Sequence, residues 1–308
     1  MTYKHLFGPV PSRRLGVSLG IDMVPYKTCS LNCVYCECGA TTALTLKRDQ
    51  YTPTDEITAE LDDYLKSEPS LDYITFSGSG EPTLHNGIGR ILNFLKEKHP
   101  RYKVAVLTNG TLLHDSSLRK EIIGADLVMP SLDAVSEEVF RKVNRPHEAV
   151  SLDSMTGGLT AFREEYRGAL WLEIFIVPGL NDSDSELQMI RKTLGQIKPD
   201  RVQINTLDRP GVESWVMPAG KAELESISSF LNGEVIASFR SRKKVRSFSR
   251  DIETHIVSTL KRRPCTARDL SAVLGLHLNE VNKYLQLLLE SGNITSEEED
   301  RGLFFRIR

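Results

Sequence analysis

Long apolar runs are missing from this chain of 308 residues. Because no stretch approaches the roughly 18 apolar residues that cross a bilayer, we expect no membrane span. The opening residues MTYKHLFGPVPSRRLG lack the apolar core and cleavage site of a signal peptide. We therefore predict a cytoplasmic protein, and the composition of 40% hydrophobic and 26% charged residues is typical of globular chains.

A distributed set of cysteines is also missing. The chain has five cysteines, and four of them lie within ten residues, from Cys29 to Cys38. This clustering does not suit a disulfide framework, and in a reducing compartment it indicates metal or redox chemistry. Cys29, Cys33 and Cys36 are spaced C-x3-C-x2-C, and one short loop with this spacing can bring three thiolates to a single metal centre.

A second cysteine pair that would complete a zinc site is absent from the sequence. Structural zinc takes four ligands, and although Cys38 could supply the fourth, the resulting C-x2-C-x-C spacing fits zinc sites poorly. We therefore favour an iron–sulfur cluster and keep zinc as the alternative. A [4Fe–4S] cluster usually takes four thiolates, so three cysteines would leave one iron open to a substrate or cofactor.

From about residue 16 to residue 231, buried-strand patterns alternate with amphipathic helical patterns. Six strand–helix units in a row predict an α/β fold with a parallel sheet, in which the chemistry gathers beyond the carboxyl ends of the strands. The predicted strands are Gly16–Ile21, Tyr73–Ser77, Lys103–Thr108, Asp126–Ser131, Leu170–Val177 and Arg201–Asn205. The predicted helices are one that begins at Thr54, and Ile88–Lys98, Ser116–Ile123, Ser136–Val143, Leu152–Glu165, Asp184–Ile197 and Lys221–Leu231.

The pattern changes after residue 237. Residues 238–250 hold six basic residues and no acidic one, in a chain with a net charge of −2. Residues 251–308 read as three helices followed by two short strands, the plan of a winged helix-turn-helix domain. We therefore predict an α/β domain over 1–237, a basic linker over 238–250 and a winged helix-turn-helix domain over 251–308.

The cysteine loop resembles the hallmark of the radical S-adenosylmethionine (SAM) superfamily, C-x3-C-x-aromatic-C, with Tyr35 in the aromatic place beside SAM. The resemblance implies that residues 1–237 form a partial (β/α)6 TIM-like barrel. It also implies a [4Fe–4S] cluster with Cys29, Cys33 and Cys36 as its ligands, and SAM bound through its amino and carboxylate groups to the open iron.

Further motifs of the superfamily follow at the predicted strand ends. The stretch FSGSGEP is similar to the Gly-Gly-Glu-Pro motif, with Ser79 in place of its first glycine. By this resemblance Gly80 and Glu81 contact the SAM amino group, and residues after the later strands contact its ribose, methionyl and adenine parts. Taken singly, each of these stretches is also a common strand-end turn. The implied contacts after the later strands are Asn109, Ser131, Asp133 and Val177.

The chemistry that the resemblance implies is reductive cleavage of SAM to methionine and a 5′-deoxyadenosyl radical, which abstracts hydrogen from a substrate. The electron would come from a flavodoxin or a ferredoxin. Cys38 is expected to lie close to SAM without binding iron, and Cys265 is expected to be structural.

The stretch FGPVPSRRLGVSLGID resembles iron–sulfur oxidoreductases grouped with the tRNA wyosine-base synthases, which implies a tRNA nucleobase as substrate. There are two departures. Those synthases use further cysteines near the N-terminus, and none precedes Cys29 here. They also use a lysine near the substrate, whereas Lys198 precedes the sixth predicted strand and would lie at the wrong end of the barrel.

Polar residues in loops at the productive end of the barrel are candidate substrate contacts. Arg13 and Arg14 precede the first predicted strand and could bind an anion or pair with acidic residues. The loop candidates are His85, Arg145, His147, Asn181, Asp182, Asp208, Arg209 and Glu213.

Charge leaves the role of the C-terminal part open. Residues 251–308 contain eight basic and nine acidic residues, and the predicted wing carries four acids at 297–300, which phosphates would repel. We keep three hypotheses. The first is a radical SAM enzyme acting on an unidentified substrate, with an RNA nucleobase as one candidate. The second is a radical activase that modifies a protein or peptide docked on the winged helix. The third is a non-enzymatic iron–sulfur sensor that binds DNA.

Overall fold

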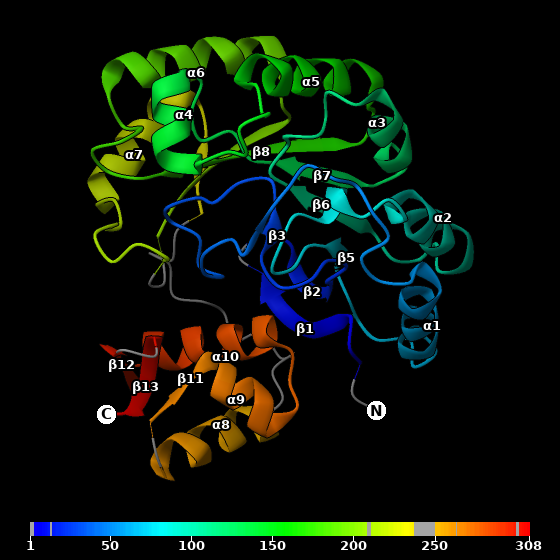
Figure 1. Ribbon diagram of the computed structural model, residues 1–308, viewed down its shortest axis with the longest axis vertical. Coiled ribbons are helices and arrows are strands. Elements are labelled where there is room, and N and C mark those ends of the chain that lie inside the picture. The colour runs from blue at the N-terminus through cyan, green and yellow to red at the C-terminus, as the bar shows by residue number, and fades with distance from the viewer. Residues whose placement is uncertain (1–2, 13, 208–210, 237–249, 263, 300–301) are drawn as a thin grey trace.

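The computed structural model describes residues 3–12, 14–207, 211–236, 250–262, 264–299 and 302–308. Its larger part is an eight-stranded sheet in the order β1-β2-β5-β6-β7-β8-β9-β10 (Figure 1). Every neighbouring pair is parallel except β1 and β2. This is the predicted α/β fold, and it is consistent with a partial TIM barrel. The strands are β1 Leu6–Ser12, β2 Gly16–Ile21, β5 Tyr73–Phe76, β6 Val104–Thr108, β7 Leu127–Pro130, β8 Ala169–Ile176, β9 Arg201–Thr206 and β10 Glu234–Val235.

Helices line the outside of this curved sheet, one after another (Figure 1). Side chains alternate between the two faces of a strand, and on the helix-facing side they are apolar and buried, as at Leu19, Ile74 and Val106. The opposite side carries polar residues such as Thr75 and Glu173 as well as a smaller apolar cluster that includes Ala105 and Met129. The helices are α1 Thr54–Leu65, α2 Ile88–Lys98, α3 Ser116–Ile122, α4 Glu137–Asn144, α5 Leu152–Glu165, α6 Asp184–Ile197 and α7 Lys221–Leu231, with a short 3-10 helix at Pro82–Leu84.

The sequence did not predict β1, the antiparallel strand at the edge of the sheet. Its sequence LFGPVPS contains Pro9 and Pro11, which lack the backbone N–H that an interior strand donates on both sides. An edge strand needs partners on one side only, and for that reason it tolerates proline. The prolines therefore hide a strand that is otherwise paired with β2 from Leu6↔Ile21 to Ser12↔Gly16.

The C-terminal residues form a separate group of three helices and a small antiparallel sheet in the order β11-β13-β12. Its core is apolar, with Ile256, Leu270, Leu285 and Phe305 packed around a buried Cys265. Within this group α10 lies nearest the large sheet (Figure 1). The assignment of a winged helix domain stays a prediction. The elements are α8 Arg250–Arg262, β11 Cys265–Thr266, α9 Ala267–Leu274, α10 Leu278–Glu290, β12 Ile294–Glu299 and β13 Gly302–Ile307.

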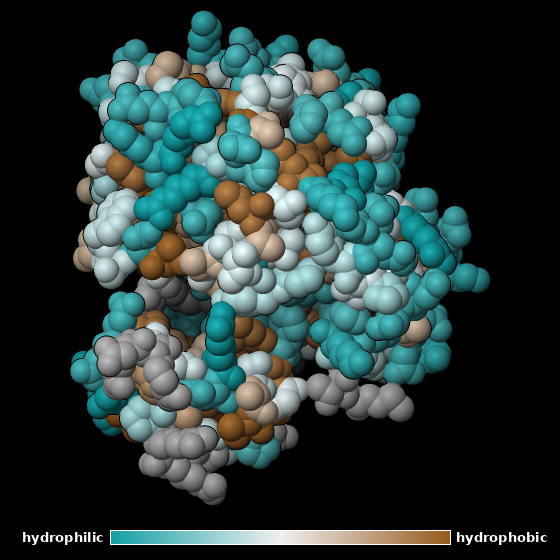
Figure 2. All heavy atoms as spheres, in the orientation of Figure 1, coloured by the Kyte–Doolittle hydropathy of each residue, from teal (hydrophilic) through white to brown (hydrophobic). Residues whose placement is uncertain are grey.

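The surface is largely hydrophilic on the face shown in Figure 2, where hydrophobic side chains show only in scattered patches. Among the described helices, none combines the length and apolar character that a bilayer crossing requires.

Candidate functional site

The cysteine loop follows β2, at the carboxyl end of the parallel sheet. Cys29 lies in the two-residue strand β3 (Thr28–Cys29), which pairs with β4 (Ala43–Leu44). The amide of Asn32 donates to Asn144 O at 3.0 Å, and this bond ties the loop to the end of α4. On the other side, the amide of Glu81 donates to Thr28 O at 3.0 Å. The loop is therefore fixed between the ends of two strand–helix units.

The three predicted ligand thiols lie close enough to influence one another. Burial, Asp133 and the Cys36 and Cys29 sulfurs all raise the pKa of Cys33. Burial and Glu81 raise the pKa of Cys29 to about 11. Cys36 differs, because a hydrogen bond with Cys38 and the neighbouring Lys27 ammonium lower its pKa to about 5 against the effect of burial.

This arrangement fits a thiolate-ligated cluster. Nowhere in the described part of the chain do three His, Cys, Asp or Glu side chains converge on the position of a single metal ion. A [4Fe–4S] cluster does not require ligands that converge on one point, because each thiolate binds a different iron and the sulfurs lie around the cluster. Cys29, Cys33 and Cys36 lie on one loop and each sulfur has a side-chain N–H donor beside it, which suits thiolate ligands; their binding of a cluster stays a prediction.

Gly80 fixes the distance between the FSGSGEP loop and the cysteine loop. A Cβ atom at this position would lie 2.2 Å from Thr28 O and 2.7 Å from a methyl carbon of Val24. No side chain fits there, because backbone atoms cannot yield as the tip of a flexible side chain can. The glycine therefore lets the two loops touch.

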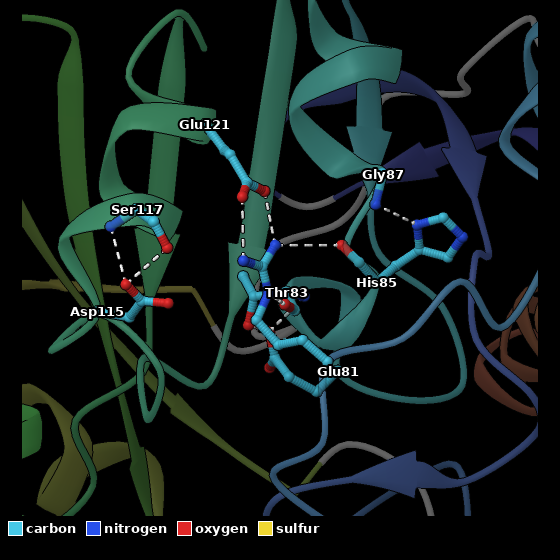
Figure 3. Close-up of polar contacts among 8 residues, drawn as sticks. Glu81, Thr83, His85, Gly87, Asp115, Ser117 and Glu121 are labelled. Atoms are coloured by element: carbon cyan, nitrogen blue, oxygen red, sulfur yellow. Dashed lines mark hydrogen bonds and ion pairs between the residues drawn. The ribbon is translucent and has the colours of Figure 1, made fainter.

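Glu81 is buried, and its carboxylate accepts four hydrogen bonds from within the protein. Donors are the amide and hydroxyl of Thr83, the hydroxyl of Thr108 at 2.7 Å and the amide of Asn109 at 2.7 Å. Burial raises the pKa of Glu81 and these donors oppose the rise. The guanidinium of the nearby Arg48 binds the carboxylate of Glu121 and the carbonyl groups of Thr83 and His85. Figure 3 shows Glu81, Thr83, His85 and Glu121 close together in this region. In this structure Glu81 joins β5 to β6, and its contact with SAM stays a prediction.

The strand ends after β6 and β7 carry the next two predicted contacts. Asn109 donates to Ser30 Oγ at 2.8 Å and reaches Cys29 Sγ at 3.5 Å. Ser131 follows β7, and its amide donates to Thr108 O at 3.0 Å. Both residues thus lie on the carboxyl edge of the sheet, and Asn109 is in direct contact with the cysteine loop.

The partly buried Tyr35 and the buried Asp133 form one hydrogen-bonded unit. The Tyr35 hydroxyl donates to Asp133 at 2.5 Å, and its ring stacks on Phe175 with ring centres 3.8 Å apart. Asp133 also accepts from Asn144 at 2.7 Å and from the Phe175 amide at 2.9 Å. Burial raises the pKa of Asp133 to about 6, although these donors oppose the rise. Val177 directly follows β8, the strand that contains Phe175, and is buried.

Arg14 lies inside the barrel, beside Glu173 of β8. Its guanidinium pairs with Glu173 at 2.7 Å and contacts Met129 Sδ at 3.5 Å. Asn205 donates to the same Glu173 oxygen at 2.8 Å, while its own Oδ1 atom is buried and meets no hydrogen-bond partner among the described residues. Arg14, Glu173 and Asn205 thus form a polar cluster inside the barrel, which we call the polar floor. Arg14 pairs with an acidic residue, which is one of the two roles predicted for it from the sequence.

Several predicted substrate contacts prove to be structural. His85 is fully buried, with one ring nitrogen bound to Thr52 O at 2.7 Å and the other accepting from the Gly87 amide at 3.0 Å. Asn181 is equally buried and binds the backbone of Val177. For these two residues the prediction was wrong, because their side chains satisfy loop backbone groups instead of facing the opening.

The remaining candidates divide by location. Arg145 and Glu213 form an ion pair beside the cysteine loop, and the Glu213 amide donates to Val34 O. The His147 amide donates to Ser30 O, whereas Asp182 binds the Gly179 amide. Arg13, Asp208 and Arg209 lie outside the described residues.

Sequence reasoning missed Lys27 and Asn144. Each donates to a predicted ligand: Lys27 Nζ lies 2.9 Å from Cys36 Sγ, and Asn144 Nδ2 lies 3.4 Å from Cys33 Sγ. Burial lowers the pKa of Lys27, but the neighbouring cysteine sulfurs outweigh it and raise the pKa to about 12. The position of Lys27 directly before the cysteine stretch was the available signal, whereas nothing in the sequence links Asn144 to Cys33.

The C-terminal group contacts the barrel close to this site. His277, the N-terminal cap of α10, lies 3.2 Å from Asp22 and stacks on Phe7. Asp22 in turn accepts from the amide and hydroxyl of Ser79 in the FSGSGEP loop. The Cys38 thiol lies 4.0 Å from Asn279 Oδ1. A cavity of about 310 Å³ lies between the cysteine loop and the C-terminal group, lined by Cys36, Cys38, Arg268, Leu285 and Phe305 among others.

A mostly parallel sheet carries a three-cysteine loop at its carboxyl edge, an architecture consistent with a partial TIM barrel. The sequence profile of the Radical SAM superfamily matches residues 23–189, more than half of the chain. The chain belongs to this superfamily of enzymes and, within it, to the UPF0026 proteins.

Two relatives illustrate the relation. A UPF0026 protein of Helicobacter pylori (strain 26695) is 30% identical over 94% of this chain and 93% of its own length. A protein named GTPase Obg from Brachyspira hyodysenteriae is 36% identical over 96% of this chain, but the chain spans only 44% of that protein's length.

Solved structures show the same fold. A radical SAM methyltransferase from Sphaerobacter thermophilus superposes with a TM-score of 0.54 at 16% identity, over 72% of this chain and 67% of that one. The wyosine synthase TYW1, solved with a lysine–pyruvate adduct bound, superposes with a TM-score of 0.53 at 14% identity, over 73% of this chain and 75% of that one.

Proposed function

We propose that this enzyme binds a [4Fe–4S] cluster through Cys29, Cys33 and Cys36 and uses it with SAM. When bound, the cluster would supply one electron that cleaves SAM to methionine and a 5′-deoxyadenosyl radical, which abstracts hydrogen from the substrate. The observation that carries the proposal is the junction of the cysteine loop with the FSGSGEP loop, through the Glu81–Thr28 hydrogen bond and the Gly80 contact.

The residues around this junction have distinct roles in the proposal. Gly80 lets the FSGSGEP loop lie against Thr28, and the backbone of this loop would receive the SAM amino group. Asn109 and Ser131 present polar groups at the strand ends and would hold the ribose and methionyl parts. Tyr35, stacked on Phe175, and Val177 provide a dry apolar wall, and exclusion of water protects a reactive radical from side reactions. Asp133 accepts a hydrogen bond from the Tyr35 hydroxyl and so holds the ring in position.

The electron in this proposal comes from a low-potential one-electron donor of the flavodoxin or ferredoxin class. Reduction occurs at the cluster, so the donor has to approach the cysteine loop. The Cys36–Cys38 side of the loop borders the cavity against the C-terminal group, which makes the rim of this cavity a natural approach for the donor.

For the substrate we favour an RNA nucleobase. The polar floor of the barrel offers acceptors at Glu173 and at Asn205 Oδ1, which has no hydrogen-bond partner within the described part of the chain, with Arg14 as a donor beside them. Arg14 and Glu173 neutralise each other, so a neutral planar group with N–H and C=O edges is complementary to this set. The resemblance of the N-terminal stretch to tRNA-modifying oxidoreductases points the same way.

A protein or peptide substrate is the second candidate. In a winged helix that binds DNA, the second helix of the helix-turn-helix unit enters the major groove. Here the equivalent helix is α10, and its first turn contacts the barrel through His277 and Glu280. This orientation favours a docking or covering role for the C-terminal group over reading of nucleic acid. Because the chain belongs to a superfamily of enzymes, we do not propose the DNA-binding sensor further.

Anaerobic reconstitution tests the cluster and its chemistry. With SAM and dithionite, the loaded wild-type protein should form 5′-deoxyadenosine. Cys36→Ser should lose the cluster and the product, whereas the matched variant Cys38→Ser should retain four irons per chain. A fully loaded protein that forms no 5′-deoxyadenosine would refute the proposed function.

Deuterium transfer tests the substrate. Transfer RNA from cells grown in D2O, incubated with the loaded enzyme, SAM and dithionite, should yield 5′-deoxyadenosine that carries deuterium, as read by mass spectrometry. Label that comes from a deuterated protein extract and not from the RNA would identify the protein-modifying alternative instead.

A further inference from the structure

Each of the three predicted ligand thiols has one side-chain N–H donor in reach. Lys27 Nζ lies 2.9 Å from Cys36 Sγ, Asn144 Nδ2 lies 3.4 Å from Cys33 Sγ, and Asn109 Nδ2 lies 3.5 Å from Cys29 Sγ. The donors come from three separate places: the start of the cysteine loop, the end of α4 and the end of β6. Within the described residues the fold therefore brings a side-chain donor to each sulfur, and Cys29 also has the Leu31 amide at 3.5 Å.

Lys27 differs from the two asparagines in charge and in the directness of its contact. Its side chain is buried, yet no carboxylate lies within ion-pair distance of it in the described part of the chain. A buried cation without an anionic partner costs several kcal/mol. The position of Lys27 thus calls for an anion, and the structure offers it the Cys36 sulfur.

The asparagine amides are weaker donors to sulfur. Asn109 directs its amide mainly to Ser30 Oγ at 2.8 Å, and Asn144 directs its amide mainly to Asp133 at 2.7 Å. Both amides are neutral, and their distances to sulfur are 0.5 Å or more longer than that of Lys27. Their effect on a bound cluster should therefore be smaller than that of the ammonium group.

We propose that Lys27 is a positioning residue that raises the reduction potential of the cluster by placing a fixed positive charge on the Cys36 ligand. The proposal rests on the proposed function and concerns the same site. Reduction adds one electron to the cluster from a flavodoxin- or ferredoxin-class donor, with no bond made or broken. Because the reduced form carries one more negative charge, an adjacent cation stabilises it more than the oxidised form.

The test is an EPR-monitored redox titration of the reconstituted protein without SAM. Lys27→Met keeps the length of the side chain but removes the charge and the donor, whereas Lys27→Arg keeps both. Lys47→Met is the matched control, since Lys47 is exposed and pairs only with Asp49 in the described structure. Iron content is measured first, so that only fully loaded samples are compared.

We expect the ratio of reduced to oxidised cluster in Lys27→Met to fall about tenfold at a fixed solution potential, equivalent to about 59 mV for a one-electron couple. Lys27→Arg and Lys47→Met should remain close to the wild type. A fully loaded Lys27→Met protein with an unchanged midpoint would overturn the proposal. A wild-type chain that takes up no cluster would instead refute the proposed function.

A second variant covers poor loading. Should Lys27→Met take up little iron, Lys27→Gln keeps an N–H donor without the charge. A lowered potential in Lys27→Gln supports the effect of charge, and an unchanged one contradicts it. If both variants lose the iron while Lys27→Arg retains it, Lys27 serves cluster assembly, and the proposed control of potential is wrong.

Discussion

Because Gly80 has only a hydrogen atom as its side chain, the FSGSGEP loop can approach the cysteine loop closely. The FSGSGEP loop could be read from the sequence, but the reason for its last glycine could not, because Thr28 lies 52 positions earlier in the chain. Only the fold shows that the Gly80 Cα faces Thr28 O, where a Cβ would come within 2.2 Å.

Replacement of Gly80 by alanine should destabilise the protein. The added methyl group meets backbone that cannot move without breaking the Glu81–Thr28 hydrogen bond, and overpacking of this kind costs about 1–3 kcal/mol. Urea unfolding of the cluster-free protein measures the change. Gly195→Ala is the control, because nothing lies within 4 Å of that Cβ position in α6, and it should be neutral or mildly stabilising. Equal midpoints for the two variants would contradict this account of Gly80.

Asp133 should make stability depend on pH. Its pKa in the folded protein is about 6, raised from 3.8 mainly by burial. Between these values the folded state binds more protons than the unfolded state, so the free energy of unfolding falls as pH rises. The contribution is fully present below about pH 4 and is lost by about pH 6.

The matched variant is Asp133→Asn, which cannot ionise. The stability of the wild type relative to this variant should fall by roughly 3 kcal/mol from pH 4 to above pH 6, since one pKa unit corresponds to about 1.4 kcal/mol. Denaturant titrations across this range measure it. A difference that stays constant, or that grows with pH, would contradict the raised pKa.

At the scale of elements, the sequence predicted the parallel strands and their helices well. Buried runs such as Gly16–Ile21 and the helical periodicity at Ile88–Lys98 match the observed bounds. Local pattern suffices there, because the hydrophobic period itself reports burial. The prediction from sequence failed at β1, an edge strand that contains two prolines. It also failed at the two-residue strands β3 and β11, because only pairing with another strand defines them.

The first turn of α10 holds the C-terminal group against the barrel. His277 caps the helix, stacks on Phe7 and lies 3.2 Å from Asp22, which also binds Ser79. Ring stacking of His277 on Phe7 contributes about 0.5–1.5 kcal/mol. This contact therefore links the C-terminal group to the FSGSGEP loop.

His277→Asn should loosen that link while it keeps a favourable capping residue. Amide hydrogen exchange near Asp22 and in the first turn of α10 should become about tenfold faster, equivalent to roughly 1.4 kcal/mol of local opening. His255→Asn, at an exposed position of α8, is the control. Exchange that rises equally in both variants would show that the His277 contact does not hold the group in place.

For the whole molecule, the sequence could predict the class of chemistry but not the residues that surround the candidate site. The three cysteines and the strand-end motifs are local in sequence. The donors to sulfur at Asn109 and Asn144, the polar floor of Arg14 and Glu173, and the α10 contact each join residues that lie far apart in the chain. Such pairs depend on the three-dimensional arrangement of all strands and helices, and one sequence does not reveal them.

The central claim is that only three protein sulfurs bind the cluster, so that one iron remains open to SAM. Mössbauer spectroscopy of the ⁵⁷Fe-reconstituted wild-type protein, recorded with and without SAM, tests it most directly. The account predicts four irons per chain and a change in the signal of one of them when SAM is added. A zinc-loaded protein, or a four-iron cluster whose spectrum ignores SAM, would contradict it.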